Sequence, residues 1–315
     1  MNPALSKQSS LVHWGRSLAK TYAAVFFCHS PWIGAWFAAL TWWTPRAALG
    51  GLTGLVAAIV WARVFQLQSS GRLHLVNGLL CGLVICAFHS IDIPYFLWII
   101  LAALLSTLLA YWLAGLFWKS ARLPLLSLPF VLACWAVFLA WQVHAPSALP
   151  VGALARGDPL LPWPMLDSFF ISLGWLLLIP YPAAGVLVFA GILAASRYLA
   201  LLAAAGYAVG MLTVHLLGGG DATPIGFNFS LAAMALGGFF SVPGRGSFLL
   251  ALAGSALTGW LTIVLEVLLH PLYLPLLTMP FLGVAYLLLG PLGARLAPSQ
   301  PALMLEHPVS PEANL

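Results

Sequence analysis

The feature that most constrains this chain is an eight-residue stretch that occurs twice, as LPLLSLPF at 123–130 and as LPLLTMPF at 274–281. Six of the eight residues are identical, and Ser127 is replaced by another hydroxyl residue, Thr278, at an offset of 151 residues. The same offset relates further identical pairs, which are Pro31 and Pro182, Gly34 and Gly185, Arg46 and Arg197, Asn77 and Asn228, Leu80 and Leu231, and Phe88 and Phe239. One constant offset without insertion indicates a tandem duplication.

The two copies carry too little charge for a soluble domain. Charged residues make up 6% of the 315 residues and hydrophobic residues 62%, whereas a soluble domain carries roughly 25% charged residues. A membrane-spanning helix needs about 20 mostly apolar residues. Ten apolar blocks meet or approach this length, approximately at 22–44, 46–66, 75–90, 93–117, 124–142, 168–194, 198–217, 227–242, 247–269 and 275–294. The sequence therefore predicts an all-α integral membrane protein with about ten transmembrane helices.

The positions of the basic residues predict the orientation of the chain. Cytoplasmic loops of membrane proteins carry an excess of Lys and Arg. If the N-terminus is cytoplasmic, ten of the twelve basic residues fall inside, and only Arg46 and Arg156 fall outside. The twelve basic residues are scattered along the chain rather than gathered in a stripe, so we expect no nucleic-acid partner. The first apolar run is interpreted as a span, because nine more blocks follow it. We expect a multi-pass protein of a bacterial inner membrane with both termini cytoplasmic.

Five apolar blocks fall in each copy, within residues 1–165 and 166–315. An odd number of spans makes the second copy enter the membrane from the opposite side. Inverted repeats of this kind form one integrated domain and place the substrate path at their interface, where helices are discontinuous. The prolines of the repeated stretch leave carbonyl groups without helical partners, and a polar solute or water could bond to them. The alternative is that the prolines only kink a packed helix, with Ser127 and Thr278 bonded to their own helices.

Two asparagines form the next duplicated feature, in VNGLLCG at 76–82 and GFNFSLA at 226–232. An Asn that follows a turn and precedes an apolar run is typical of a helix N-cap. Such a cap directs the positive end of the helix dipole and a carboxamide toward the middle of the protein. We predict that Asn77 and Asn228 cap their own helices and lie beside the path.

These paired motifs resemble the urea transporter family of bacteria and vertebrates. The similarity rests on NG-x-L-x-G at 77–82, GFNFSLAAMALGGFF at 226–240, the two LPxx[ST]xPF stretches and PW-x-G from Pro31 to Gly34, and it covers roughly residues 16–295. The resemblance implies ten spans and two tilted half-membrane pore helices per protomer. It also implies a homotrimer in membrane lipid, in which each protomer passes urea through its own narrow slot down its gradient. No cofactor or ion coupling is implied.

The resemblance also implies roles for individual residues. Aromatic and aliphatic walls press on the faces of the planar urea molecule, and oxygen atoms in a line accept its N–H groups. The implied walls are Phe27, Val76, Leu80, Leu178, Phe227 and Leu231. Ser127 and Thr278 form the central hydrogen-bonding pair, Asn77 and Asn228 shape the ends of the pore helices, and Trp175 is a wall or a gate. Urea offers one acceptor and four donors, and its dehydration without replacement hydrogen bonds costs several kcal/mol.

Ser127 in place of the usual threonine and Leu178 in place of a slot phenylalanine depart from the family pattern. Two further departures each remove an acceptor. Members of the family carry a Gln or Glu three residues before each slot position, and the aligned residues here are Ala24 and Trp175. Neither side chain accepts a hydrogen bond, since the indole is a donor only. The resemblance therefore implies a divergent member of the family, for urea or a closely related small neutral amide.

Two alternatives stay open. One is a channel for ammonia or another small solute, in which the imidazoles of His29, His89 or His215 bind a small amine. The other is a non-conducting relative whose path Trp175 plugs. Glu266, the only acid within a predicted span, has no assigned role. The sequence contains no nucleophile–base constellation, metal-ligand spacing or phosphate loop, so an enzyme, a metal and a cofactor are not predicted.

Overall fold

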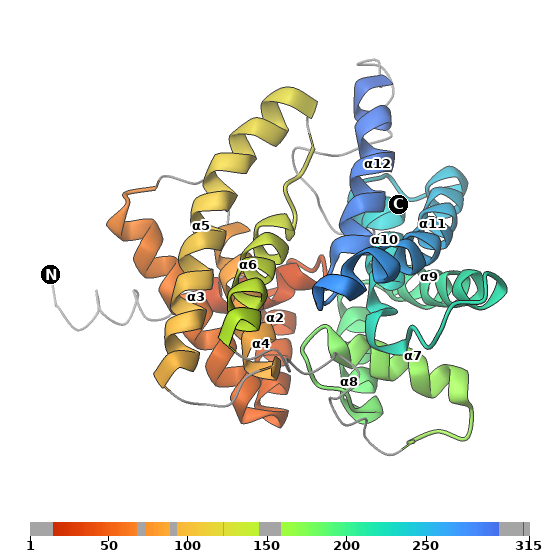
Figure 1. Cartoon of the computed structure of the whole chain (residues 1–315). Coiled ribbons are helices and arrows are strands. Elements are labelled where there is room, and N and C mark those ends of the chain that lie inside the picture. The colour runs from red at the N-terminus through yellow and green to blue at the C-terminus, as the bar shows by residue number, and fades with distance from the viewer. Residues whose placement is uncertain are drawn as a thin grey trace, which may run out of the picture.

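The computed structural model describes residues 15–67, 73–88, 93–121, 123–144, 159–295 and 311. The first copy contains a helix over residues 15–25, then α2 (Pro31–Leu40), α3 (Pro45–Val64), α4 (Leu73–Phe88), α5 (Ile93–Ala121) and α6 (Leu128–His144). The second contains α7 (Pro164–Trp175), α8 (Pro182–Ala195), α9 (Arg197–Leu216), α10 (Phe227–Met234), α11 (Arg245–Leu269) and α12 (Met279–Arg295). Short helical turns are η1 (Thr41–Trp43), η3 (Thr223–Ile225), η4 (Ala235–Phe239) and η5 (His270–Leu272). Figure 1 shows the two copies as neighbouring helical bundles.

Four helices within the described ranges are long and apolar enough to cross a membrane, at Pro45–Val64, Tyr95–Phe117, Arg197–Leu216 and Arg245–Leu272. Shorter apolar helices lie at Leu73–Phe88, Leu128–Gln142, Pro182–Ala195 and Met279–Pro291. The offset of 151 residues pairs α3 with α9 and α5 with α11, so the long helices occupy equivalent places in the two copies. The predicted all-helical architecture is confirmed, whereas the count of ten spans stays a prediction.

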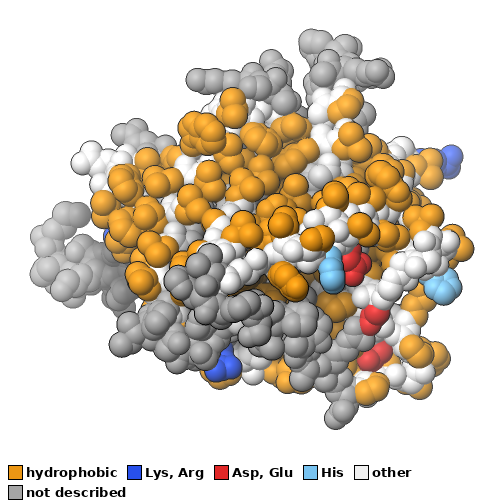
Figure 2. Space-filling view, in the orientation of Figure 1, with side chains coloured by type: hydrophobic (Ala, Val, Ile, Leu, Met, Phe, Trp, Pro, Cys, Tyr) orange, Lys and Arg blue, Asp and Glu red, His pale blue; other side chains and the backbone are white. Residues whose placement is uncertain are grey.

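The surface is apolar over large areas. Figure 2 shows a face that is covered mainly by hydrophobic side chains, with few charged ones. Trp32 is 83% exposed, Val267 70% and Trp112 68%. Large exposed apolar areas of this kind are unfavourable in water and favourable in lipid. The chain is a multi-pass membrane protein.

The first predicted span of each copy is broken, which corrects the continuous blocks 22–44 and 168–194. The first helix ends at residue 25 and α2 begins at Pro31, while α7 ends at Trp175 and α8 begins at Pro182. Each proline is the first residue of its helix, where the missing N–H costs nothing. The two copies thus break their first span at equivalent positions, and in each the second part begins with a proline.

A glycine allows the two arms of each broken helix to cross closely. A Cβ atom at Gly34 would lie 1.7 Å from the carbonyl oxygen of Ala19, and one at Gly185 would lie 1.7 Å from that of Phe170. Both pairs are related by the 151-residue offset. The glycine shared by the two copies therefore reflects a backbone contact that only glycine allows.

Candidate functional site

The duplicated hydroxyls meet where the two copies join. Ser127 Oγ and Thr278 Oγ1 are 3.0 Å apart and form a hydrogen bond. Ser127 lies just before α6 and is 8% exposed, and Thr278 lies just before α12 and is 7% exposed. The structure therefore brings the predicted central pair into contact. The sequence left open that each hydroxyl bonds only to its own helix, whereas this bond joins the two copies.

The prolines of the repeated stretch start helices rather than kink them. Pro124 and Pro275 lie in non-helical segments, and Pro129 and Pro280 lie in the first turns of α6 and α12. A proline in the first turn removes no helical hydrogen bond. The break in helical structure is therefore the non-helical segment before α6 and before α12. In both copies this segment contains a left-handed residue, Leu126 with φ 52° and Leu277 with φ 51°.

The paired asparagines cap the helices that follow the hydroxyls, which corrects the prediction that they cap their own. Asn77 lies inside α4, donates through Nδ2 to the carbonyl of Leu126 at 3.2 Å, and accepts from the backbone N–H of Phe130 at 2.8 Å. Asn228 makes the equivalent bonds to Leu277 at 3.0 Å and to Phe281 at 3.3 Å. One carboxamide thus satisfies an orphan N–H and a free carbonyl at the start of each helix.

Two aromatic donors bind further carbonyls across the junction. The Trp135 indole N–H donates to the carbonyl of Pro275 at 2.8 Å, and the Tyr286 hydroxyl donates to that of Leu125. Trp135 and Tyr286 are themselves related by the 151-residue offset. Protein donors thus bond most of the carbonyls that were expected to be free for a solute. The hydroxyl pair is therefore the main remaining acceptor for a solute at this point.

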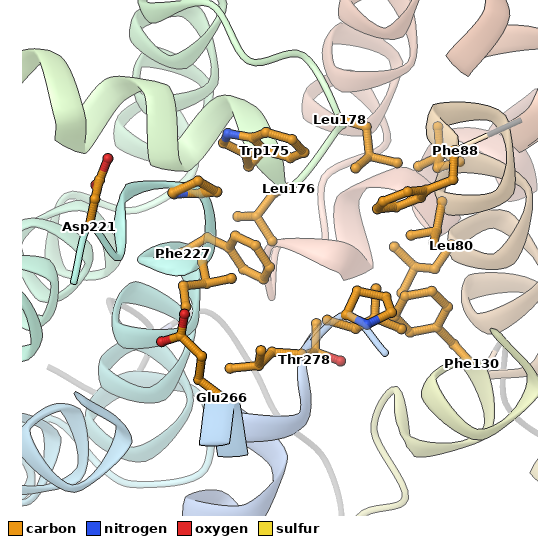
Figure 3. A pocket seen from close by; sticks show the side chains of 17 residues that line it. Leu80, Phe88, Phe130, Trp175, Leu176, Leu178, Asp221, Phe227, Glu266 and Thr278 are labelled. Atoms are coloured by element: carbon orange, nitrogen blue, oxygen red, sulfur yellow. The ribbon is translucent and has the colours of Figure 1, made fainter. Parts of the chain in front are cut away.

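A cavity of about 390 Å³ lies beside the hydroxyl pair. Its lining comprises Leu80, Leu83, Val84, Phe88, Phe130, Trp175, Leu176, Leu178, Asp221, Pro224, Ile225, Phe227, Glu266, Pro275, Leu276, Leu277 and Thr278. Figure 3 shows Trp175, Leu178 and Thr278 around its centre, with Phe227 facing Leu80 across it. Five predicted site residues therefore share one mostly apolar space, and Thr278 joins it to the hydroxyl pair.

A family model described as urea transporter matches residues 16–293. The chain belongs to the urea transporter family. The match spans both copies and covers α2 to α11 in full, together with nearly all of the first helix and of α12. Membership implies a urea channel or transporter function.

In this member of the urea transporter family, the other predicted wall residues lie outside the cavity lining. The Phe27 ring packs against Phe239, Phe240 and Phe281 at centroid distances of 4.8, 6.4 and 6.1 Å. Val76 is half-buried in α4, and Leu231 is 4% exposed in α10. Phe88 and Phe130 were not predicted as lining residues, although they are the equivalents of Phe239 and Phe281 and the shared offset could have pointed to them.

The surroundings of the equivalent wall positions consequently differ between the two copies. Leu178, Phe88 and Phe130 line the cavity, and the Phe88 ring also contacts Phe138 at a centroid distance of 5.2 Å. Among their equivalents, the Phe27 ring contacts both Phe239 and Phe281. The π-helical turn η4 carries Phe239, whereas Phe88 ends the regular helix α4. A π-helical turn inside a helix often marks a functional site, and here it places an aromatic ring against Phe27.

The positions that lack the family acceptor both end a helix in the same way. The N–H groups of Phe27 and Cys28 donate to the carbonyls of Ala24 and Ala23, and those of Leu178 and Ile179 donate to the carbonyls of Trp175 and Gly174. This is the Schellman arrangement, with its left-handed residue at Phe27 or Leu178. The side chains differ, since Ala24 is exposed and Trp175 is 4% exposed.

The described histidines lie away from the cavity lining. His29 is exposed and stacks on Phe239 at a centroid distance of 5.8 Å, and His215 is exposed at the end of α9. His89 lies outside the described residues. Within the described ranges, no group of three or more His, Cys, Asp or Glu side chains could hold a metal ion. The acids that the structure brings to the cavity are Asp221 and Glu266.

Proposed function

We propose that this protein is a channel-like facilitator that passes urea, or a closely related small neutral amide, down its gradient. The contact between Ser127 Oγ and Thr278 Oγ1 carries the proposal. A polar pair buried between apolar walls offers lone pairs to the N–H groups of a solute that has lost its water. Each hydrogen bond regained offsets part of the several kcal/mol that dehydration costs.

The contact between equivalent residues supports inverted repeats. A residue touches its own equivalent only near the axis that relates two copies. This happens for Ser127 with Thr278, and again for Trp36, whose indole donates to the carbonyl of Leu187 at 3.0 Å over the same offset of 151 residues. Two such contacts fit a two-fold axis through one integrated domain made from residues 1–165 and 166–315, with two half-membrane pore helices among about ten spans.

The apolar side chains beside the hydroxyl pair favour a neutral solute. The side chains that flank the pair in the cavity lining, such as Leu276, Leu277 and Phe130, are apolar. An ion that entered such a place would lose its hydration at a cost of several kcal/mol even after relaxation. Neutral urea avoids this cost, so passage needs neither ion coupling nor a chemical step.

The assembly and orientation belong to the proposal as well. The family resemblance supports a homotrimer with one pore per protomer, and the exposed apolar side chains supply surface for lipid or for neighbouring protomers. The distribution of the basic residues supports a bacterial inner membrane with both termini cytoplasmic.

A second candidate is a channel for ammonia or another small solute, or a non-conducting relative. The ring contacts of Phe27 with Phe239 and Phe281 favour it, because they fill the space around a predicted wall position. The burial of Trp175, where the family has an acceptor, favours it too.

Solute flux into proteoliposomes distinguishes these functions. We expect rapid uptake of urea, slower uptake of methylurea, acetamide and formamide, and no uptake of sodium ions. Uptake of ammonia without urea would favour the small-solute alternative. No uptake of any of these solutes by a correctly folded protein would favour the non-conducting relative.

A further inference from the structure

A residue of the C-terminal tail packs against the second copy. Residues 296–310 separate Pro311 from the end of α12, and Pro311 is buried. Its Cγ atom lies 3.5 Å from the place that a Cβ atom would take at Gly238. Gly238 belongs to η4, the π-helical turn that follows α10. The tail therefore contacts this turn directly.

The glycine at this contact is specific to the second copy. Its equivalent at the offset of 151 residues is Ala87, in α4. A Cβ atom at Gly238 would lie 2.8 Å from a terminal carbon of Leu199 and 3.0 Å from one of Leu202, both in α9. Glycine thus keeps η4 close to α9 and leaves the backbone of the turn within reach of Pro311.

One sequence pattern takes two helical forms in the two copies. In η4 the N–H group of Phe240 donates to the carbonyl of Ala235 at 2.9 Å, a bond over five residues that is typical of a π-helix. In the first copy the equivalent segment continues as regular α-helix to Phe88. The two glycines of η4 accept either backbone, because they carry no Cβ atom. A return to regular helix would rotate the end of the turn by about one residue, or about 100°, and would move the Phe239 ring.

Phe239 links this turn to a predicted wall of the path. Its ring is half-buried and packs at centroid distances of 4.8 Å from Phe27 and 4.9 Å from Phe240. Phe27 is 8% exposed and lies outside the cavity lining, whereas its equivalent, Leu178, lines the cavity. In its π form, the turn therefore fills the space beside Phe27 with an aromatic ring.

We infer that the C-terminal tail is an autoinhibitory element, in which Pro311 holds η4 in its π form and thereby keeps Phe239 against Phe27. Loss of this contact lets the turn become regular, moves the Phe239 ring and opens the path at this wall position. A contact made in only one of two forms shifts their populations toward that form, so a single proline ring is enough. The inference rests on the proposed function and adds a means of regulating it.

Urea flux through variants of the whole chain tests the inference. Pro311→Asp places a carboxylate at a buried contact, which is unfavourable, so residue 311 should leave η4. We expect urea flux to rise about four- to fifteenfold, the factor by which one or two buried CH₂ groups shift a two-state equilibrium, with methylurea flux rising at least as much. Pro301→Asp, the same change at another proline of the tail, is the matched control and should leave both fluxes unaltered.

Amide hydrogen exchange of the detergent-solubilised protein tests the contact without flux. We expect the amides of η4 to exchange at least about fourfold faster in Pro311→Asp, while those of α3, in the other copy, keep their rates. Unchanged exchange in η4, or a measurable urea flux that does not rise, would overturn the inference and leave the proposed function standing. Faster exchange in η4 with no urea flux in either protein would instead uphold the contact and contradict the proposed function.

Discussion

Phe27 and Leu178 share a left-handed backbone conformation, with φ of 57° at each residue. They are 151 residues apart, and each follows a helix that ends in the same hydrogen-bond pattern. A non-glycine residue in this conformation costs about 1–3 kcal/mol. Both copies accept this strain at a predicted wall position, where a glycine would relax the backbone but would offer no side chain to the path.

Substitution with valine tests this strain. A β-branched side chain is strongly disfavoured at positive φ, so Leu178→Val should lower stability by about 1–3 kcal/mol more than the loss of one methylene predicts. Leu176→Val is the matched control, because Leu176 also lines the cavity but has φ of −60°. Thermal unfolding in detergent provides the comparison. Equal unfolding temperatures for the two variants would contradict the conformation assigned to Leu178.

The asparagine caps predict a second stability effect. Asn77→Ala removes an acceptor from the Phe130 N–H and a donor from the Leu126 carbonyl. Leaving such buried groups unpaired costs about 1–3 kcal/mol each, so the unfolding temperature should fall by several degrees, and Asn228→Ala should act alike. Asn77→Asp keeps an acceptor but places a buried carboxylate against the Leu126 carbonyl, so it should not recover the loss. An Ala variant as stable as the unaltered protein would show that the cap contributes little.

The glycine at the first helix crossing predicts a steric effect. In Gly34→Ala, the new Cβ atom would lie 1.7 Å from the carbonyl oxygen of Ala19, so the helices must separate. We expect a marked loss of folded protein, measured as the monodisperse fraction after detergent extraction. Gly115→Ala is the control, because a Cβ atom there meets nothing within 4 Å. The crossing would be wrong if both variants gave the same yield.

The aromatic contact of Phe27 with Phe239 predicts a change in size selectivity. Phe27→Leu makes that position identical to its equivalent, Leu178, and removes the ring that packs at 4.8 Å from Phe239. We expect methylurea flux to rise relative to urea flux by about two- to tenfold, as for a barrier lowered by about 0.5–1.4 kcal/mol. Phe96→Leu, at a 38% exposed residue of α5, should leave the ratio unchanged. An unchanged ratio in Phe27→Leu would place Phe27 outside the path.

The duplicated pattern makes the centre of the site predictable. The shared offset alone pairs Ser127 with Thr278, and the two hydroxyls are in contact. The partners of Asn77 and Asn228 were not predictable, because capping of a helix 53 residues away depends on tertiary packing. A sequence motif signals an N-cap only for the helix that contains it.

Other features were missed for similar reasons. The breaks at Phe27 and Leu178 carry no glycine, so they lack the usual signal for a left-handed residue. Asp221 and Glu266 lie 45 residues apart, and they reach one cavity only through the packing of η3 and α11. The π-helical turn over Ala235–Phe239 has no counterpart in α4, although the two segments share much of their sequence pattern.

The role of the hydroxyl pair is decided by the urea permeability of proteoliposomes that contain the double variant Ser127→Val and Thr278→Val. Valine matches the shape of Thr278 and is one methyl group larger than Ser127. The change removes both hydroxyls, so a dehydrated urea molecule would find no replacement hydrogen bonds there. We predict a fall of at least about tenfold, equivalent to about 1.4 kcal/mol, with a smaller fall in each single variant. Thr213→Val, which removes a hydroxyl bonded to its own helix at Val209, should have no effect. Urea permeability at the unaltered level in a folded double variant would contradict a path through this pair.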